Sequence, residues 1–330
     1  MTILTKTIRR TAFLFALPFL IWSGYWAASA QAITKGVSLA SEDTQFLGLS
    51  AQFEVASVTG YPQRFTVGLS DIEIGTENSF IWKTQGVSLE AKSYLPNEIT
   101  LELSEPHRIS GSLGELDIDA AHAEITALFQ PNWRLALGNI SLSFNDLKIA
   151  SANQWGASIG TVLASVKSFP DNSNAYQLSA ELENLNLSDV IVGVPAKYQT
   201  IQNLSLLSEI LLTRPLDRLI IGNGAPELQI LLLQKAQFDF GASLISVDGK
   251  LAYDENGAMT GNVNVTVQDW KSLFNLAKDV GYIEPNLENF FAMILADLAA
   301  QEGSDDTLTI PLNIQNNKIS YGALNLGILP

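Results

Sequence analysis

Cysteine is absent from the 330 residues of this chain, and histidine occurs only twice. Without cysteine there is no disulfide framework, no thiol nucleophile and no thiolate ligand for a metal ion. Positive charge is also scarce, because 19 lysine and arginine residues stand against 34 aspartate and glutamate residues, a formal net charge of -15. A balance this acidic repels phosphate backbones, so we expect no nucleic-acid partner.

Sequence motifs for common cofactors are also missing. There is no phosphate-binding Gly-Lys-Ser/Thr loop, no dinucleotide-binding glycine fingerprint and no zinc-protease helix. Carboxylates are abundant enough to supply the acid pair of a hydrolase, but no motif supports that chemistry. We therefore expect a protein that is not an enzyme and that binds no cofactor, and we assign no catalytic residue.

The two histidines do not form a metal site with nearby carboxylates. Asp117 and Asp119 precede His122, and on an extended strand the two aspartates share one face while His122 points to the other. His107 follows a proline in residues 105–108, where we expect a loop and a surface ion pair. The sequence therefore predicts no metal ligand.

The N-terminus has the three parts of a secretory signal. Lys6, Arg9 and Arg10 precede an uncharged apolar run over residues 11–28, and residues 28–32 form two overlapping Ala-x-Ala exits. A basic segment, an apolar segment and small residues at the exit are the marks of a signal peptide. We therefore expect residues 1–32 to direct the rest of the chain to the periplasm.

The alternative is that the same segment stays as a membrane anchor. Residues 11–28 are near the lower limit for spanning a bilayer, and Trp22, Tyr25 and Trp26 occupy the positions of an interfacial aromatic belt. In that case the protein is tethered to the inner membrane and residues 33–330 are still exported.

A short pattern, apolar-x-Asn/Asp-apolar-x-apolar, recurs along the chain. Its central residues are Asp71, Asn139, Asp146, Asn184 and Asn203. We interpret each copy as strand alternation that slips by one residue at a β-bulge, where Asn or Asp tolerates unusual backbone angles. The alternative is that each Asn or Asp ends one strand and begins the next. Repeated bulges predict long, strongly curved antiparallel sheets.

The rest of the chain predicts a mainly β fold, α+β by content. Two strands flank the tight turn at Asn256-Gly257, and residues 195–213 are ambiguous, with a strand favoured over a helix. After residue 270 the apolar spacing becomes helical, which predicts a C-terminal helical hairpin packed on the sheet. We expect a single β-rich domain over residues 33–330, with a subdivision near 190–225 as the alternative.

One motif is similar to a known family. It consists of Gly60, Tyr61, Pro62, Arg64 and Phe65. With residues 94–97, 214–218, 247–251 and 326–330, it resembles the alphaproteobacterial family called domain of unknown function 2125. The resemblance implies an exported or membrane-tethered envelope protein and carries no known activity. More loosely, bulged strands behind an N-terminal anchor resemble AsmA-type envelope proteins, whose sheets form lipid-holding grooves.

These observations lead to one expectation and two alternatives. We expect an exported cell-envelope protein that holds a lipid or another hydrophobic small molecule, because an uncovered apolar sheet face is unusual in a soluble monomer. The first alternative is a scaffold that binds other envelope proteins by strand addition. The second is a hydrolase that uses a pair of carboxylates.

Overall fold

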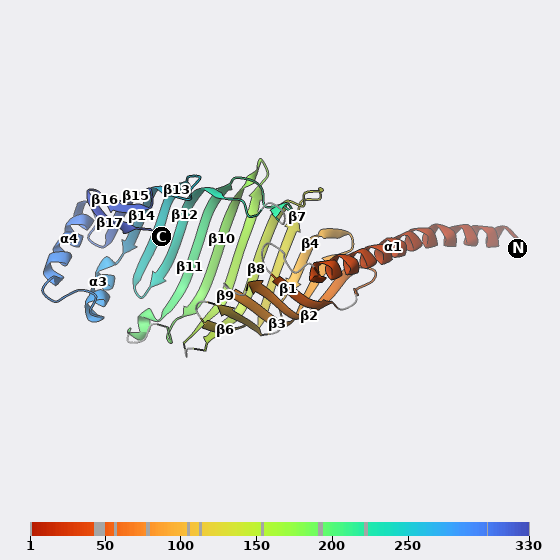
Figure 1. The fold of residues 1–330 in the computed structure, drawn as a ribbon, viewed down its shortest axis with the longest axis horizontal. Helices are drawn as coiled ribbons and strands as arrows, with labels where there is room; N and C mark the ends of the chain where they lie inside the picture. Colours follow the sequence, from red (N-terminus) through yellow and green to blue (C-terminus); the bar gives the residue numbers. More distant parts are fainter. Residues whose placement is uncertain are drawn as a thin grey trace. The chain divides into compact units, whose positions relative to one another are not determined.

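Figure 1 shows the fold in a computed structural model of the chain, which describes residues 2–42, 50–55, 58–76, 80–103, 106–111, 114–152, 155–190, 194–220, 224–301 and 303–329. Side chains of the N-terminal helix are described from residue 17 to residue 38. Seventeen strands with antiparallel pairing and three helices lie in the described residues, which confirms the expected mainly β class. The chain clusters into two compact units, Met1–Leu113 and Gly114–Pro330.

The first unit is a helix followed by a small antiparallel sheet. Strand β2 lies between β1 and β3, and β4 and β5 pair with the two halves of β3. Its elements are α1 (Thr2–Glu42), β1 (Ser50–Val55), β2 (Arg64–Thr76), β3 (Phe80–Lys92), β4 (Leu95–Glu102) and β5 (His107–Gly111). Phe65, Val67, Ile72 and Val87 are its buried apolar residues on β2 and β3. Over the part of the chain that is described, no helix combines the length and apolar character needed to cross a bilayer.

The second unit is a long antiparallel meander. Strands β6 and β7 both pair with β8, and from β8 onward each strand pairs with the next one along the chain. The strands are β6 (Gly114–Asp119), β7 (His122–Phe129), β8 (Leu137–Ser151), β9 (Gly156–Phe169), β10 (Asn172–Asn186), β11 (Thr200–Leu212), β12 (Leu228–Phe240), β13 (Ser243–Tyr253), β14 (Met259–Gln268), β15 (Thr307–Gln315), β16 (Lys318–Tyr321) and β17 (Leu324–Ile328).

Helices α3 (Trp270–Asp279) and α4 (Glu288–Gln301) form the expected C-terminal hairpin and pack against β14 and β15. The ambiguous segment contains one 3-10 turn, η1 (Ala196–Tyr198), and then strand β11, as favoured. Gly257 has a φ of 78° at the expected tight turn between β13 and β14, which a residue with a Cβ rarely adopts.

The boundary between the two units lies at Leu113 and not near 190–225. Strands β10 and β11, on either side of residue 190, pair from Ala175 opposite Leu211 to Asn186 opposite Thr200. A continuous ladder of backbone hydrogen bonds holds that part of the chain in one sheet, so it cannot serve as a linker.

At Asp146 and at Asn184 the alternation of apolar and polar residues slips by one position, and the neighbouring strands slip at the same level of the sheet. Both residues have positive φ, 51° and 56°, and Gly160 on the strand between them carries no side chain. On one side of this line the paired residues are Phe144, Val162, Leu182 and Leu204. On the other side they are Leu147, Ile159, Leu185 and Ile201. Apolar residues thus stand three positions apart in four neighbouring strands.

This arrangement differs from the expected bulge at Asp146, Asn184 and Asn203. The register continues unbroken past each of them on β8, β9, β10 and β11, so no extra residue is inserted. A left-handed residue turns two successive side chains to one face, and Asn145 and Asp146 are indeed both exposed. Because the neighbouring strands change facing at the same level, the register between them is the same on both sides of the slip.

Register shifts do accompany the other two copies of the pattern. Asp71 has a φ of 50°, and the pairing of β1 with β2 shifts between Gln52 and Glu54, beside it. At Asn139 the pairing of β7 with β8 shifts between Leu128 and Phe129. These shifts match the local extra residue that defines a bulge.

Replacing Asn184 tests the line of phase slips. Asn184→Ala should lower the free energy of unfolding by about 1–2 kcal/mol, because alanine is penalised in the left-handed region. Asn184→Gly is the matched control and should lose less, since glycine adopts this conformation freely. Urea unfolding followed by circular dichroism measures both. An alanine variant at least as stable as the glycine variant would contradict this explanation.

Candidate functional site

The strand register gives the sheet of the second unit two different faces. The residues that lie opposite one another across one row are apolar: Ala123, Phe144, Val162, Leu182, Leu204, Phe238, Ile245, Val267 and Leu308. The adjacent row, on the opposite face, is mostly polar: Glu124, Ser143, Leu163, Glu181, Ser205, Gln237, Ser246, Thr266 and Thr309. We call the first surface the apolar face.

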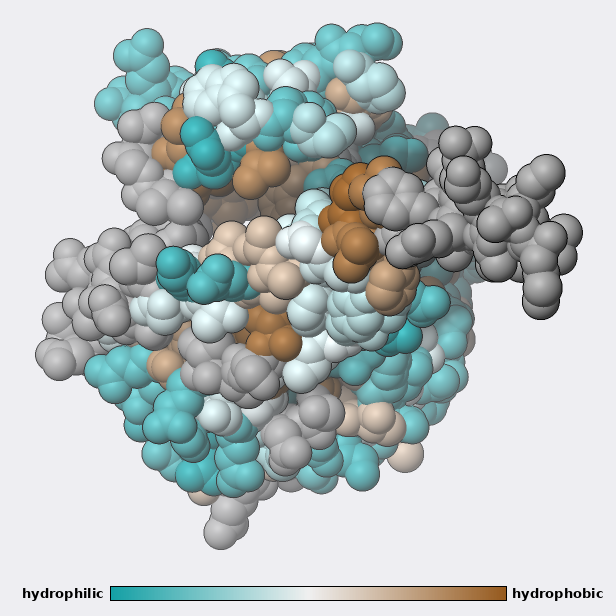
Figure 2. Space-filling view, turned by 90° about the vertical axis from the view of Figure 1, so that its right-hand side faces the viewer, coloured by the Kyte–Doolittle hydropathy of each residue, from teal (hydrophilic) through white to brown (hydrophobic). Residues whose placement is uncertain are grey.

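The apolar face is fully covered only near its ends. Ala123 and Leu308 are buried, whereas the row residues between them are half-buried. Around Leu308 the helical hairpin provides the cover, because Trp270 and Ala299 form a buried cluster with it. Figure 2 views a different side of the molecule from Figure 1 and shows hydrophobic side chains among hydrophilic ones on that side. The sheet therefore carries apolar side chains that the described residues do not fully enclose.

Small side chains line the middle of this face. The next row on the same side contains Ile125, Leu142, Ala164, Ala180, Leu206, Ala236 and Val247. Three of these residues are alanines: Ala164 and Ala180 lie opposite each other, and Ala236 lies beyond Leu206. Seven strands from β7 to β13 span about 29 Å at about 4.8 Å per strand.

One end of the apolar face is closed by the segment that follows β11. Tyr176 is completely buried, and its hydroxyl accepts a hydrogen bond from the Leu216 N–H at 2.8 Å. The Leu216 carbonyl accepts one from the Leu137 N–H at 2.7 Å. The buried Asp217 carboxylate accepts the Leu219 N–H at 2.9 Å. These hydrogen bonds hold the family-like residues 214–218 over this end of the apolar face, and we call this segment the plug.

Cationic side chains gather around one aromatic ring beside this plug. The guanidinium groups of Arg134 and Arg218 lie 5.2 and 5.1 Å from the centroid of Trp133, whose side chain is 62% exposed. Arg134 also lies 3.9 Å from the Asp217 carboxylate. In a protein of net charge -15 this is a local concentration of positive charge at the rim of an apolar surface.

The other end of the strands is closed by Tyr198. It is buried, its ring lies 5.4 Å from that of Phe240, and its hydroxyl donates to the Ser272 carbonyl at 3.3 Å. A Cβ on Gly241 would come within 2.2 Å of the Tyr198 ring, so only glycine fits there.

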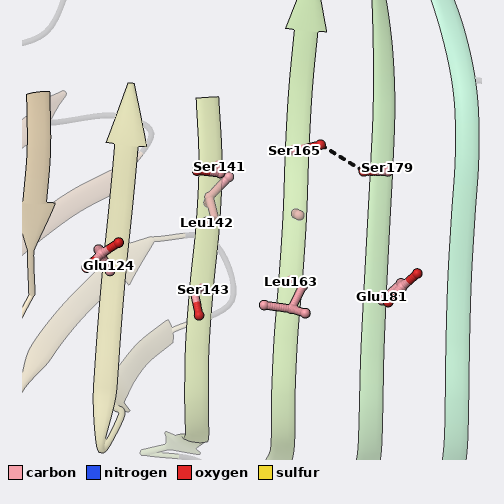
Figure 3. A pocket seen from close by; sticks show the side chains of 9 residues that line it. Glu124, Ser141, Leu142, Ser143, Leu163, Ser165, Ser179 and Glu181 are labelled. Atoms are coloured by element: carbon pink, nitrogen blue, oxygen red, sulfur yellow. Dashed lines mark hydrogen bonds between the residues drawn. The ribbon is translucent and has the colours of Figure 1, made fainter. Parts of the chain in front are cut away.

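The opposite, polar face holds a pocket of about 350 Å³ on β7 to β10 (Figure 3). Glu124 on β7 and Glu181 on β10 stand on its outer strands, and Ser165 on β9 is hydrogen-bonded to Ser179 on β10 at 2.8 Å. Three strand spacings put the two carboxylates roughly 14 Å apart. Glycosidase acid pairs need about 5–9.5 Å, so this pocket lacks the geometry of that hydrolysis.

A second catalytic candidate is a Gly-x-Ser-x-Gly sequence, which was not predicted as a site. Gly156 to Gly160 match the pattern, but Ser158 lies within strand β9, paired with Lys148 and Asn186. A nucleophile elbow instead places its serine on a sharp turn between a strand and a helix. The match is therefore part of the sheet.

The histidines occupy unrelated places. His107 is buried at the start of β5, 5.7 Å from the Trp82 ring, which corrects the expected surface loop. His122 is exposed opposite Asn145, and Asp117 and Asp119 pair with Ala150 and Lys148 of the same strand, β8. Across the described residues no cluster of potential metal ligands is found.

The family-like motif lies in the first unit, at the turn before β2. Gly60 has a φ of 97°, and a Cβ there would clash with Arg64 at 2.6 Å. Phe65 is buried, whereas Tyr61 is 45% exposed. Arg64 makes a bidentate contact with Glu90 at 3.0 Å. The motif also contacts helix α1, whose Trp22 and Trp26 donate hydrogen bonds to the Pro62 and Arg64 carbonyls.

Fold and site together define a mainly β protein whose long antiparallel meander exposes part of an apolar face. The family model described as an uncharacterised protein conserved in bacteria (DUF2125) matches residues 26–330. The chain belongs to this family, as its motif indicated. No curated protein and no solved structure matches it.

The plug at Tyr176 predicts a dependence of stability on alkaline pH. Burial raises the pKa of the Tyr176 phenol, and this outweighs the opposing effect of the Leu216 hydrogen bond. An unfolded tyrosine ionises at about pH 10. The contribution of the neutral, buried Tyr176 phenol to the stability of the fold is therefore complete below that pH and is lost as the pH rises above it.

Tyr176→Phe should therefore be less stable than the natural protein at pH 8 by about 1–3 kcal/mol, because the Leu216 N–H loses its acceptor. This difference in the free energy of unfolding should shrink above pH 10. There the unfolded natural protein is favoured by ionisation of Tyr176, and the phenylalanine variant has no such group. Urea unfolding at pH 8 and pH 10.5 measures it. A constant difference at both pH values would rule out this assignment.

Proposed function

We propose that this protein is an exported, non-enzymatic protein of the cell envelope that holds the acyl chains of an anionic lipid on its apolar face. The observation that carries the proposal is the row of half-buried apolar residues from β8 to β13. Contact with a ligand removes such surface from water, a gain of roughly 25 cal/mol per Å² of apolar area.

The dimensions of the face favour an acyl chain. Its span of about 29 Å is close to the roughly 30 Å hydrocarbon core of a bilayer, which holds the acyl chains of two leaflets, so the chain of one leaflet, about half as long, fits within it. Ala164, Ala180 and Ala236 on this face are small and carry no charge.

The rim favours an anionic headgroup. Arg134 and Arg218 lie beside the plug that closes one end of the apolar face, held against the exposed Trp133 ring. Guanidinium groups bind phosphate and carboxylate through paired hydrogen bonds.

A second candidate function, a scaffold for other proteins, is favoured by the last strand. β17 exposes Leu324, Leu326 and Ile328, the kind of apolar strand to which a partner's strand or surface binds. A protein that co-purifies without lipid would favour this candidate.

Enlarging a small residue of the apolar face tests acyl-chain binding. Ala180→Phe should weaken the binding of a fluorescent fatty acid by about 5- to 150-fold, because overpacking costs about 1–3 kcal/mol. Ser179→Phe is the matched control: it adds the same ring to the same strand on the polar face and should retain binding. Fluorescence titration measures both, with circular dichroism as the check on folding. Equal affinities in the two variants would refute the site.

Reversing a rim charge tests the headgroup. Arg218→Glu should weaken binding to phosphatidylglycerol about tenfold or more in low salt and leave diacylglycerol binding unchanged. Lys235→Glu, an equal charge change on exposed β12, is the control and should have little effect. Titration calorimetry with short-chain lipids provides the affinities. Loss of both lipids, or of neither, would contradict the assignment of the headgroup to this rim.

A further inference from the structure

The N-terminal helix is bound to the family-like motif by polar contacts. The indole N–H of Trp22 donates to the Pro62 carbonyl at 3.0 Å, and that of Trp26 donates to the Arg64 carbonyl at 2.9 Å. The Tyr25 hydroxyl donates to the Ser93 carbonyl at 3.0 Å. Three side chains on one side of α1 thus bind the backbone of the turns that flank β2 and β3.

Aromatic packing strengthens the same contact. The Trp26 ring stacks on Phe65 with centroids 5.5 Å apart and planes 20° apart, and its edge meets Tyr61 at 5.3 Å. Tyr25 packs edge-on against Phe65 at 6.5 Å. Phe65 is only 2% exposed, so helix α1 provides part of its cover. Each such aromatic pair adds about 0.5–1.5 kcal/mol beyond the burial of its area.

The receiving turn is built to fit the helix. Ser93 is 1% exposed, its hydroxyl donates to the Pro62 carbonyl at 2.9 Å, and its N–H donates to the Gln63 carbonyl at 2.9 Å. The Pro62 carbonyl therefore accepts from both Ser93 and Trp22. This explains why the motif combines Gly60, which permits the turn, with Phe65, which packs under the helix.

Cleavage at either Ala-x-Ala exit would remove all of these contacts. Trp22, Tyr25 and Trp26 precede both exits, and Ala30, at the junction between them, is buried within α1. The matched family region also begins at Trp26, before both exits.

The helix carries a different surface just before its docked segment. Leu17, Phe19, Leu20 and Ile21 are 44%, 58%, 63% and 65% exposed. They belong to the uncharged run that begins at residue 11, and Lys6, Arg9 and Arg10 precede that run. Exposed apolar side chains beside a basic segment are the combination that inserts into anionic lipid surfaces.

We propose that residues 1–42 are retained in the mature protein, and that α1 both completes the first unit and holds it on a lipid bilayer. The segment Trp22–Trp26 binds the motif, and the segment Leu17–Ile21 inserts into the lipid. The proposal takes up the anchor alternative in place of signal cleavage. It does not depend on the proposed lipid site in the second unit.

The mass of the exported protein tests retention. The full chain, with a C-terminal tag, should be purified from bacterial membranes in mild detergent. Its intact mass should correspond to all 330 residues, 35.8 kDa before the tag is added. A mass that lacks the first 30 or 32 residues would overturn the proposal.

Two variants separate docking from insertion. Leu20→Glu/Ile21→Glu should lower binding to phosphatidylglycerol-containing vesicles on the order of 100-fold and leave the melting temperature unchanged, because both side chains are exposed. Gln31→Glu, an added charge at another exposed helix position, is the control. Trp26→Ala should lower the melting temperature and retain vesicle binding. Persistent binding by the double variant, or an unchanged melting temperature in Trp26→Ala, would overturn it.

Discussion

The register of the antiparallel ladder is the constraint on which the second unit depends. In the row from Ala123 on β7 to Leu308 on β15 each apolar residue lies opposite an apolar residue on the next strand, so that nine strands contribute to one apolar face. A shift of one residue in any pair would send that strand's apolar side chains to the polar face. The line of phase slips through Asp146 and Asn184 preserves this agreement, because adjacent strands change phase together.

The apolar face has to be shielded from water, and the chain covers some parts of it more fully than others. The helical hairpin covers β14 and β15, and the plug at Tyr176 and the packing of Tyr198 close the strand ends. The middle remains half-buried. The first unit solves the same problem differently, since α1 covers Phe65 with its own aromatic residues. In the first unit the chain covers Phe65, whereas in the second unit the middle of the apolar face stays half-buried.

The sequence was sufficient for the fold class, the helical hairpin, the turn at Gly257 and the family, because these follow from local periodicity and short motifs. It located the slips at Asp146 and Asn184 but not their cause, since a bulge and a slip shared by neighbouring strands give the same pattern in one strand. The docking of Trp26 on Phe65 joins residues 39 positions apart, and the grouping of Arg134 with Arg218 joins two distant loops. Neither contact has a periodic signal, so neither could be predicted.

The most direct measurement of the central claim is native mass spectrometry of the natural full-length protein, purified from membranes in mild detergent, with lipid extraction from the same sample. The proposed function predicts at least one bound molecule per chain, with acyl chains and an anionic headgroup, that survives removal of detergent and is released on unfolding. A fully folded protein that carries no lipid, and that takes none up from added anionic lipid, would contradict it.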